Sequence, residues 1–162
     1  MKIVQPKGGE FMRYQWRVTK YNPDYRDEKG NYQKTNEWTS YSDIGKTVTK
    51  EEYETVANAY VNSVISLMNK LEVKHLRVTN LEGESPLKEG QIIYISDLNT
   101  VIQAVLRDEY WCKLESNDIF VHFGFDFYMY LGSNDDSSEV LHEIKLSGLY
   151  VELYESPYLF PS

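Results

Sequence analysis

Apolar and polar residues alternate in three parts of the chain, which predicts strands with one buried face. Residues 13–20 and 149–154 alternate near the two ends of the sequence. The longest alternation covers residues 119–131, where every odd position is apolar. One continuous strand is the simplest interpretation of that segment, and a hairpin around Gly124 is the alternative.

Apolar residues recur every three or four positions in three other segments, which predicts amphipathic helices. The longest follows Thr49, which forms a capping-box sequence with Glu52, and its apolar stripe extends to Leu71. The shorter two end near Leu106 and before Gly148. The residues predicted to cap the three helices are Thr49, Ser96 and Asp136.

The remaining segments complete an α+β pattern. Short strands are expected over residues 73–81, 91–95 and 110–115, and a long turn-rich connection over 21–45 contains a possible short strand at 38–41. One-sided helices and half-buried strands hide their apolar faces most simply in two layers. We therefore predict a mostly antiparallel sheet with two or three helices on one face and the other face open.

The first eleven residues carry a separate expectation. The codons available to the stretch from Lys7 to Met12 include a strong bacterial ribosome-binding sequence at the correct distance from a start codon. This favours Met12 as the initiator and residues 1–11 as a non-native or flexible leader. We expect one domain over residues 12–162, which is an ordinary domain size, and a bacterial source.

Charge and cysteine content narrow the environment and the class of partner. The formal net charge of −8 disfavours nucleic acid and anionic membrane, because both repel an acidic surface. No apolar run approaches the roughly 20 residues that span a bilayer. The single cysteine, Cys112, cannot form an internal disulfide, which fits a reducing cytoplasm.

Sequence motifs for cofactors and metals are absent. The chain contains no GxGxxG, P-loop, GxSxG or HExxH sequence, and its three histidines are scattered. Cys112 shares parity with Tyr110 and Leu114, which is typical of a small buried residue and not of a nucleophile. We expect no cofactor and no metal.

The chain is unusually rich in tyrosine, with 14 tyrosines and three tryptophans, the residue types from which recognition surfaces are built. If the even positions of the long strand face solvent, they form a polar and aromatic face that the last strand extends. The long connection adds further aromatic and acidic residues. The predicted binding residues are Tyr25, Trp38, Tyr41, Asp43, Phe120, His122, Asp126, Tyr128, Tyr130, Tyr150 and Glu152. The alternative is that cross-strand tyrosine pairs only stabilise the sheet.

His122 and Asp126 are the candidate pair for acid–base chemistry on that face. Four residues apart on one strand, they are separated by about 13 Å, which is too far for a direct hydrogen bond. A catalytic pair therefore requires a bulge at Gly124 or a third group from elsewhere.

Three stretches of the sequence resemble segments of a group of small bacterial proteins. The stretches are RYQWRVTKYNPDYRD, EWTSYSDIG and FVHFGFDFYMYLG. They are similar to small uncharacterised bacterial proteins that share an RWxVTKY opening and a VHFGYDYYMY-like strand, over residues 12–158. This resemblance implies a single-domain bacterial protein and carries no functional residue with it.

A looser likeness is to the immunity proteins of bacterial toxin systems, which are often small, acidic, cytosolic and aromatic on the binding face. It implies a non-enzymatic protein-binding module that covers a basic partner, such as a toxin domain. The alternative is a small enzyme or ligand-binding sensor that uses His122 and Asp126 in a pocket closed by the long connection.

Overall fold

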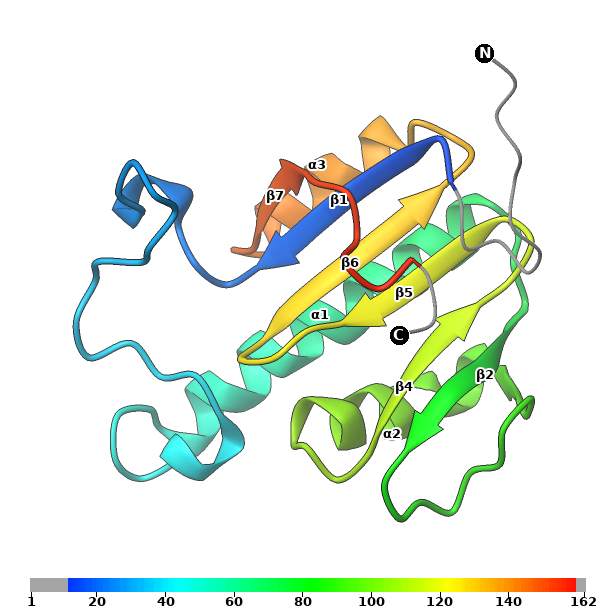
Figure 1. Cartoon of the computed structure of the whole chain (residues 1–162), viewed down its shortest axis with the longest axis horizontal. Coiled ribbons are helices and arrows are strands. Elements are labelled where there is room, and N and C mark those ends of the chain that lie inside the picture. The colour runs from blue at the N-terminus through cyan, green and yellow to red at the C-terminus, as the bar shows by residue number, and fades with distance from the viewer. Residues whose placement is uncertain (1–11, 160–162) are drawn as a thin grey trace.

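The computed structural model describes residues 12–159, so the predicted leader over residues 1–11 lies outside the described part of the chain. The described residues form two layers, with the three α-helices behind a seven-stranded sheet in the view of Figure 1. This arrangement confirms the predicted α+β fold with helices on one face of the sheet.

The sheet has the order β3-β2-β4-β5-β6-β1-β7, and every pairing is antiparallel. The first and last strands of the sequence, β1 and β7, therefore lie next to each other at one end of the sheet. The strands are β1 (Tyr14–Thr19), β2 (His75–Glu82), β3 (Ile92–Tyr94), β4 (Trp111–Glu115), β5 (Ile119–Phe123), β6 (Tyr128–Ser133) and β7 (Tyr150–Leu153).

The helices are α1 (Lys50–Lys70), α2 (Ile95–Leu106) and α3 (Ser138–Leu146). The Thr49 hydroxyl accepts the Glu52 amide at 3.1 Å, so the predicted cap of α1 is confirmed. The cap predicted at Ser96 is wrong, because β3 leads directly into α2 and Tyr94 occupies the cap position. The cap predicted at Asp136 is wrong by one residue, because Ser137 occupies the cap position of α3, without a side-chain cap hydrogen bond.

The long alternation over residues 119–131 is a hairpin, so the prediction of one continuous strand is wrong and its alternative is confirmed. Val121 pairs with Leu131, and Phe123 pairs with Met129. Both members of each pair have odd numbers, so the odd positions of β5 and β6 face the same helices. The apolar pattern therefore passes through the turn without a change of phase.

The long connection after β1 contains two 3₁₀ turns, at Pro23–Tyr25 and Tyr41–Asp43. The short strand predicted over residues 38–41 is wrong, because Trp38 is buried in the core instead of pairing with a strand. Its ring lies 5.3 Å from that of Tyr53 on α1. Trp38 thus anchors this part of the connection to the core.

The sheet face opposite the helices is covered in part by the C-terminal segment, which we call the tail (residues 154–159). In Figure 1 the tail crosses in front of β1, β6 and β5. Its Leu159 joins Met12, Phe120 and Tyr130 in a second buried apolar cluster on that face. The prediction that this face is open to solvent is therefore wrong along β5 and β6, because the irregular tail covers these strands.

Candidate functional site

The turn between β5 and β6 has an unusual backbone. Tyr128 N–H donates to the Phe125 carbonyl at 3.2 Å, and the two residues between them have positive φ, 57° at Asp126 and 68° at Phe127. Positive φ at both central positions is the mark of a type I′ hairpin turn, which normally uses Asn-Gly. A phenylalanine there is strained, so its surroundings must hold it in place.

Buried tyrosine hydroxyls and a ring cluster hold this turn. Tyr21 Oη donates to the Asp126 carbonyl at 2.5 Å, and Tyr60 Oη donates to the Phe127 carbonyl at 2.6 Å. Phe127 itself is buried on the helix side. Its ring makes edge contacts with Trp38, Tyr53 and Tyr60. Both central carbonyls and one central side chain are thus fixed, which makes the turn a rigid projection.

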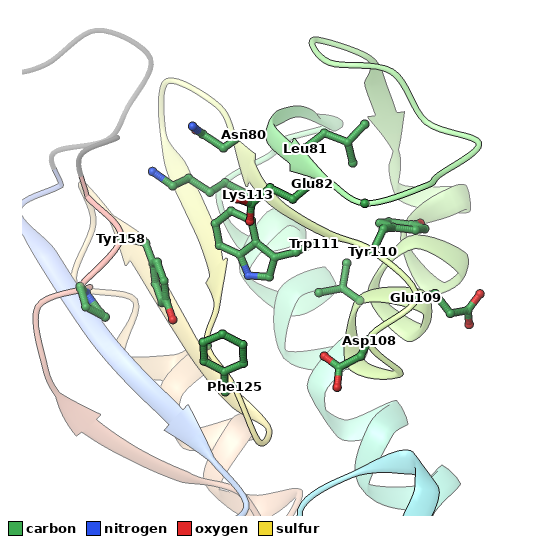
Figure 2. Close-up of a pocket in the computed structure, with 14 residues that line it drawn as sticks. Asn80, Leu81, Glu82, Asp108, Glu109, Tyr110, Trp111, Lys113, Phe125 and Tyr158 are labelled. Atoms are coloured by element: carbon green, nitrogen blue, oxygen red, sulfur yellow. The ribbon is translucent and has the colours of Figure 1, made fainter. Parts of the chain in front are cut away.

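Phe125 is the most exposed aromatic side chain of the described residues and lies on this projection. It is 81% exposed, although its odd number predicts an inward position. Grooves of about 680 Å³ and 470 Å³ meet there, and both are lined by Gly124, Phe125 and Tyr158. Figure 2 shows the larger groove, with Phe125 at one edge and Tyr158 at another. Phe125 is therefore a shared wall of two hollows.

Carboxylates outnumber amines around Phe125. The larger groove carries three carboxylates and the amine of Lys113, and the smaller carries two carboxylates and Lys34. The five carboxylates belong to Glu37, Glu82, Asp108, Glu109 and Asp126. A surface with this balance attracts basic groups and repels acidic ones.

Four predicted binding residues are buried, so the expectation that they face solvent is wrong. Phe120, His122 and Tyr130 lie beneath the tail, and Trp38 lies in the core. The period-two pattern placed Phe120, His122 and Tyr130 on the correct face of the sheet. It could not show that another part of the chain covers them.

Two predicted carboxylates are engaged within the protein. Glu152 accepts hydrogen bonds from Arg17 at 3.2 Å and from Arg26 at 2.7 Å. Asp43 accepts the amides of Thr39 and Ser40. These hydrogen bonds hold β7 and the long connection in place, so the two carboxylates are already paired within the protein. The other predicted residues retain exposure: Tyr25, Tyr41 and Asp126 are exposed, and Tyr128 and Tyr150 are half-buried.

A chain of buried hydrogen bonds joins four elements beneath the tail. Thr79 Oγ1 donates to Glu115 Oε1 at 2.6 Å, and the other carboxylate oxygen lies 3.3 Å from His122 Nε2. His122 Nδ1 lies 2.8 Å from Ser156 Oγ, which also accepts the Tyr158 amide at 3.1 Å. We call these four side chains, Thr79, Glu115, His122 and Ser156, the polar latch, because they fasten the tail to β5.

The hydrogen bonds of the polar latch determine which of its atoms carry protons. Burial opposes ionisation of Glu115, but hydrogen bonds from His122 and Thr79 keep its pKa below the usual value. An ionised carboxylate only accepts, so His122 carries its proton on Nε2 and Nδ1 accepts from the Ser156 hydroxyl. Burial lowers the pKa of His122 despite Glu115, so the ring is neutral. Every donor in the latch then has an acceptor.

The latch has the order of an acid–base–nucleophile triad but lacks its access. A serine nucleophile needs a free path to substrate and donors for an oxyanion. Ser156 is buried within the tail it belongs to, and its oxygen already accepts the Tyr158 amide. Burial also raises the pKa of the Cys112 thiol to about 12, which leaves it protonated. We interpret the latch as a structural fastening.

The residues of the alternative enzyme prediction have separate surroundings. Both ring nitrogens of His122 are engaged beneath the tail. Asp126 lies at the exposed turn and lines the smaller groove. The hairpin interrupts the strand near Gly124, as a catalytic pair of His122 and Asp126 required. Among residues 12–159, however, the hydrogen-bond partners of the His122 ring are Ser156 and Glu115, and not Asp126.

The polar latch predicts a loss of stability on acidification. The folded pKa of His122 lies below its ordinary value of 6.5, so the unfolded chain takes up the proton first as the pH falls. This proton contributes a slope of at most about 1.4 kcal/mol per pH unit. The free energy of unfolding in urea should therefore fall between about pH 7.5 and pH 5.5, and by less in His122→Gln.

The comparison of His122→Gln with the native chain isolates that one proton. The charged groups that face the ring are Glu115 and Lys113 from β4, and the Tyr158 phenol packs on it from the tail. The lowered pKa of Glu115 also makes the free energy of unfolding fall on acidification, but only at pH values near and below the ordinary glutamate pKa of 4.5. An identical pH dependence in the two proteins would contradict the neutral, buried state of His122.

The described residues show no metal cluster and no membrane-spanning helix. Between residues 12 and 159, no three His, Cys, Asp or Glu side chains gather to hold a metal ion. No helix of that part is long and apolar enough to cross a bilayer. No protein-family model matches this chain, and no curated protein or solved structure is significantly similar to it.

Proposed function

We propose that this protein is a non-enzymatic binding protein that inhibits a basic protein partner, in the manner of an immunity protein that covers a bacterial toxin domain. The docking surface is the turn at Phe125 with the two grooves that meet there. Asp126 and Tyr128, both predicted binding residues, line the smaller groove. Tyr25 and Tyr41 are exposed but line neither groove.

The rigid, exposed Phe125 is the observation that carries the proposal. A solvent-facing phenylalanine buries little apolar area on folding, whereas a prepositioned aromatic anchor lowers the entropy lost on binding. The two tyrosine hydroxyls and the Phe127 ring cluster keep the turn in one conformation before any partner arrives. Binding energy is therefore not used to order the turn.

The charge around Phe125 selects the class of partner. Five carboxylates and two lysines line the two grooves, and the whole chain carries a net charge of −8. Glu37 pairs with Lys20 and Glu109 with Arg107. The other three, Glu82, Asp108 and Asp126, form no ion pair among residues 12–159. Such a field speeds encounter with a basic surface, while the aromatic contacts slow release. A cationic toxin domain encoded beside this protein is the partner that fits these features.

Site-specific photocrosslinking tests the proposal. A photoreactive phenylalanine analogue at position 125, expressed in the source cells, should give one adduct with a protein of strongly basic sequence. The matched control places the same analogue at Leu146 on α3, which is 74% exposed and lies on the helix side. Position 146 should not give that adduct.

Reconstitution then decides whether the adduct is the inhibited partner. The purified pair should form a saturable complex, and the partner expressed alone should stop growth that co-expression of this protein restores. A partner of acidic sequence, an equal adduct at positions 125 and 146, or growth that co-expression leaves unchanged would overturn the proposal.

A further inference from the structure

We infer that the larger groove receives an arginine side chain of the partner, with the guanidinium between the Trp111 ring and the Glu82 carboxylate. This inference rests on the proposed function, because it assigns the ligand class of one part of the same surface. The groove is formed by the ends of β2 and β4, the turn at Phe125 and the tail.

Aromatic rings form the walls of this groove. Figure 2 shows the Trp111 indole in its middle, with Tyr158 to one side and Phe125 below. Trp111 Nε1 donates to the Phe123 carbonyl at 2.8 Å, so the indole is locked and its edge is satisfied. The Trp111 and Tyr158 ring centres are 5.6 Å apart. Fixed ring faces attract cations, and indole attracts them most strongly.

Carboxylates stand beside these rings. Glu82 pairs with Trp111 across β2 and β4, after a register shift between Thr79 and Glu82, and both residues line the groove. Asp108 lines the groove as well. Neither carboxylate makes a hydrogen bond or ion pair with any residue between 12 and 159. A guanidinium can therefore stack on the indole and donate to Glu82 at the same time.

The protein places its own cations on aromatic rings elsewhere in the structure. The Arg17 guanidinium lies 3.9 Å from the Tyr154 ring centre while it donates to Glu152. The Lys20 amine lies 4.1 Å from the Trp38 ring centre. The first of these is the same combination of ring, guanidinium and carboxylate that the inference assigns to the groove.

The amine of Lys113 argues for the opposite ligand, an anion, but it is not placed to bind one. Lys113 Nζ is buried and has no hydrogen-bond partner among the described residues. An enclosed amine cannot donate to a ligand in the groove without a rearrangement of its surroundings. The ionised Glu115 follows two residues later on the same face of β4 and offsets the charge. Lys113 therefore weakens cation binding in the groove without creating an anion site.

The inference is tested on the whole protein with two small probes. N-acetyl-arginine methylamide and its neutral counterpart, N-acetyl-citrulline methylamide, are titrated while the Trp111 indole N–H is followed by NMR. The arginine probe should saturate the indole shift with Kd in the millimolar range, roughly −4 kcal/mol, and citrulline should bind at least about fivefold more weakly. No saturable shift up to about 50 mM, or equal binding of the two probes, would reject the inference.

Two variants give effects of opposite sign. Glu82→Gln should weaken arginine binding by about threefold to tenfold, whereas Glu84→Gln, an exposed carboxylate outside this groove, should leave it unchanged. Lys113→Met removes the opposing charge and should tighten binding. Weaker arginine binding in Lys113→Met would overturn the inference.

The test also separates this inference from the proposed function. A basic partner that crosslinks at position 125 but binds Glu82→Gln as tightly as the native chain would reject the arginine site alone. An arginine probe that binds as described, in a protein without any basic partner, would reject the function and retain the site.

Discussion

Replacing Gly132 by alanine is expected to lower the free energy of unfolding by about 2–3 kcal/mol, close to the upper end for overpacking. Gly132 pairs with Phe120 across β5 and β6, and the Phe120 ring lies over it. A Cβ at position 132 would lie 2.1 Å from Phe120 Cε2. The ring has no free space to move into, because Met12, Tyr130 and Leu159 enclose it.

Urea denaturation measures this effect, and a second substitution checks its cause. Phe120→Leu removes the ring atoms that the new methyl would meet, so Gly132→Ala should lose much less stability in that background. The tail should also loosen in Gly132→Ala, since the displaced ring pushes on Leu159. An equal loss in both backgrounds would show that the close approach of Phe120 is not the reason for glycine.

Replacing Phe127 by alanine is expected to lower the free energy of unfolding by about 3–5 kcal/mol. The substitution empties the space among three buried rings and leaves alanine with the positive φ of 68°. The hydrogen bond from Tyr60 to the Phe127 carbonyl would then hold the turn with less support.

Phe125→Ala is the matched control for that prediction. The two phenylalanines are two positions apart in one turn, but Phe125 is 81% exposed while Phe127 is buried. Phe125→Ala should change the free energy of unfolding by no more than about 0.5 kcal/mol. Similar losses in the two variants, measured by urea denaturation, would contradict the division of the turn into an anchored side and a presented side.

Local patterns predicted the regular elements of this fold well. The period of two predicted β1, β7 and the segment that holds β5 and β6, and the period of three to four predicted all three helices. The short strand segments predicted between them correspond to β2, β3 and β4. The layer arrangement followed because each of these elements has one apolar side. The capping residues were less predictable, since Tyr94 is both the last residue of β3 and the residue at the cap position of α2.

The tail lies outside the reach of such patterns. Its composition, with Pro157 following Ser156, is typical of irregular structure. Nothing local shows that an irregular segment crosses three strands and buries Phe120 and Tyr130. The polar latch has the same origin, because Thr79, Glu115, His122 and Ser156 come from four distant parts of the sequence.

The sequence analysis identified some residues of the candidate site but not Phe125. Tyrosine content and negative charge indicated a binding surface, and Asp126 and Tyr128 do line one of the grooves. The odd number of Phe125 placed it among the buried apolar positions of the predicted strand. The alternation of faces holds within a strand and not in a turn, where Phe125 lies. The combination of Gly124 and Asp126 was the available signal for the turn.

Calorimetry on the reconstituted complex tests the account most directly. Phe125→Ala should weaken binding of the basic partner by at least about tenfold, equivalent to about 1.4 kcal/mol, as expected for an anchor residue. Leu146→Ala, which removes a comparably exposed apolar side chain from α3, should change Kd by less than about twofold. Unchanged affinity in Phe125→Ala, or equal weakening in both variants, would contradict a docking surface at the β5–β6 turn.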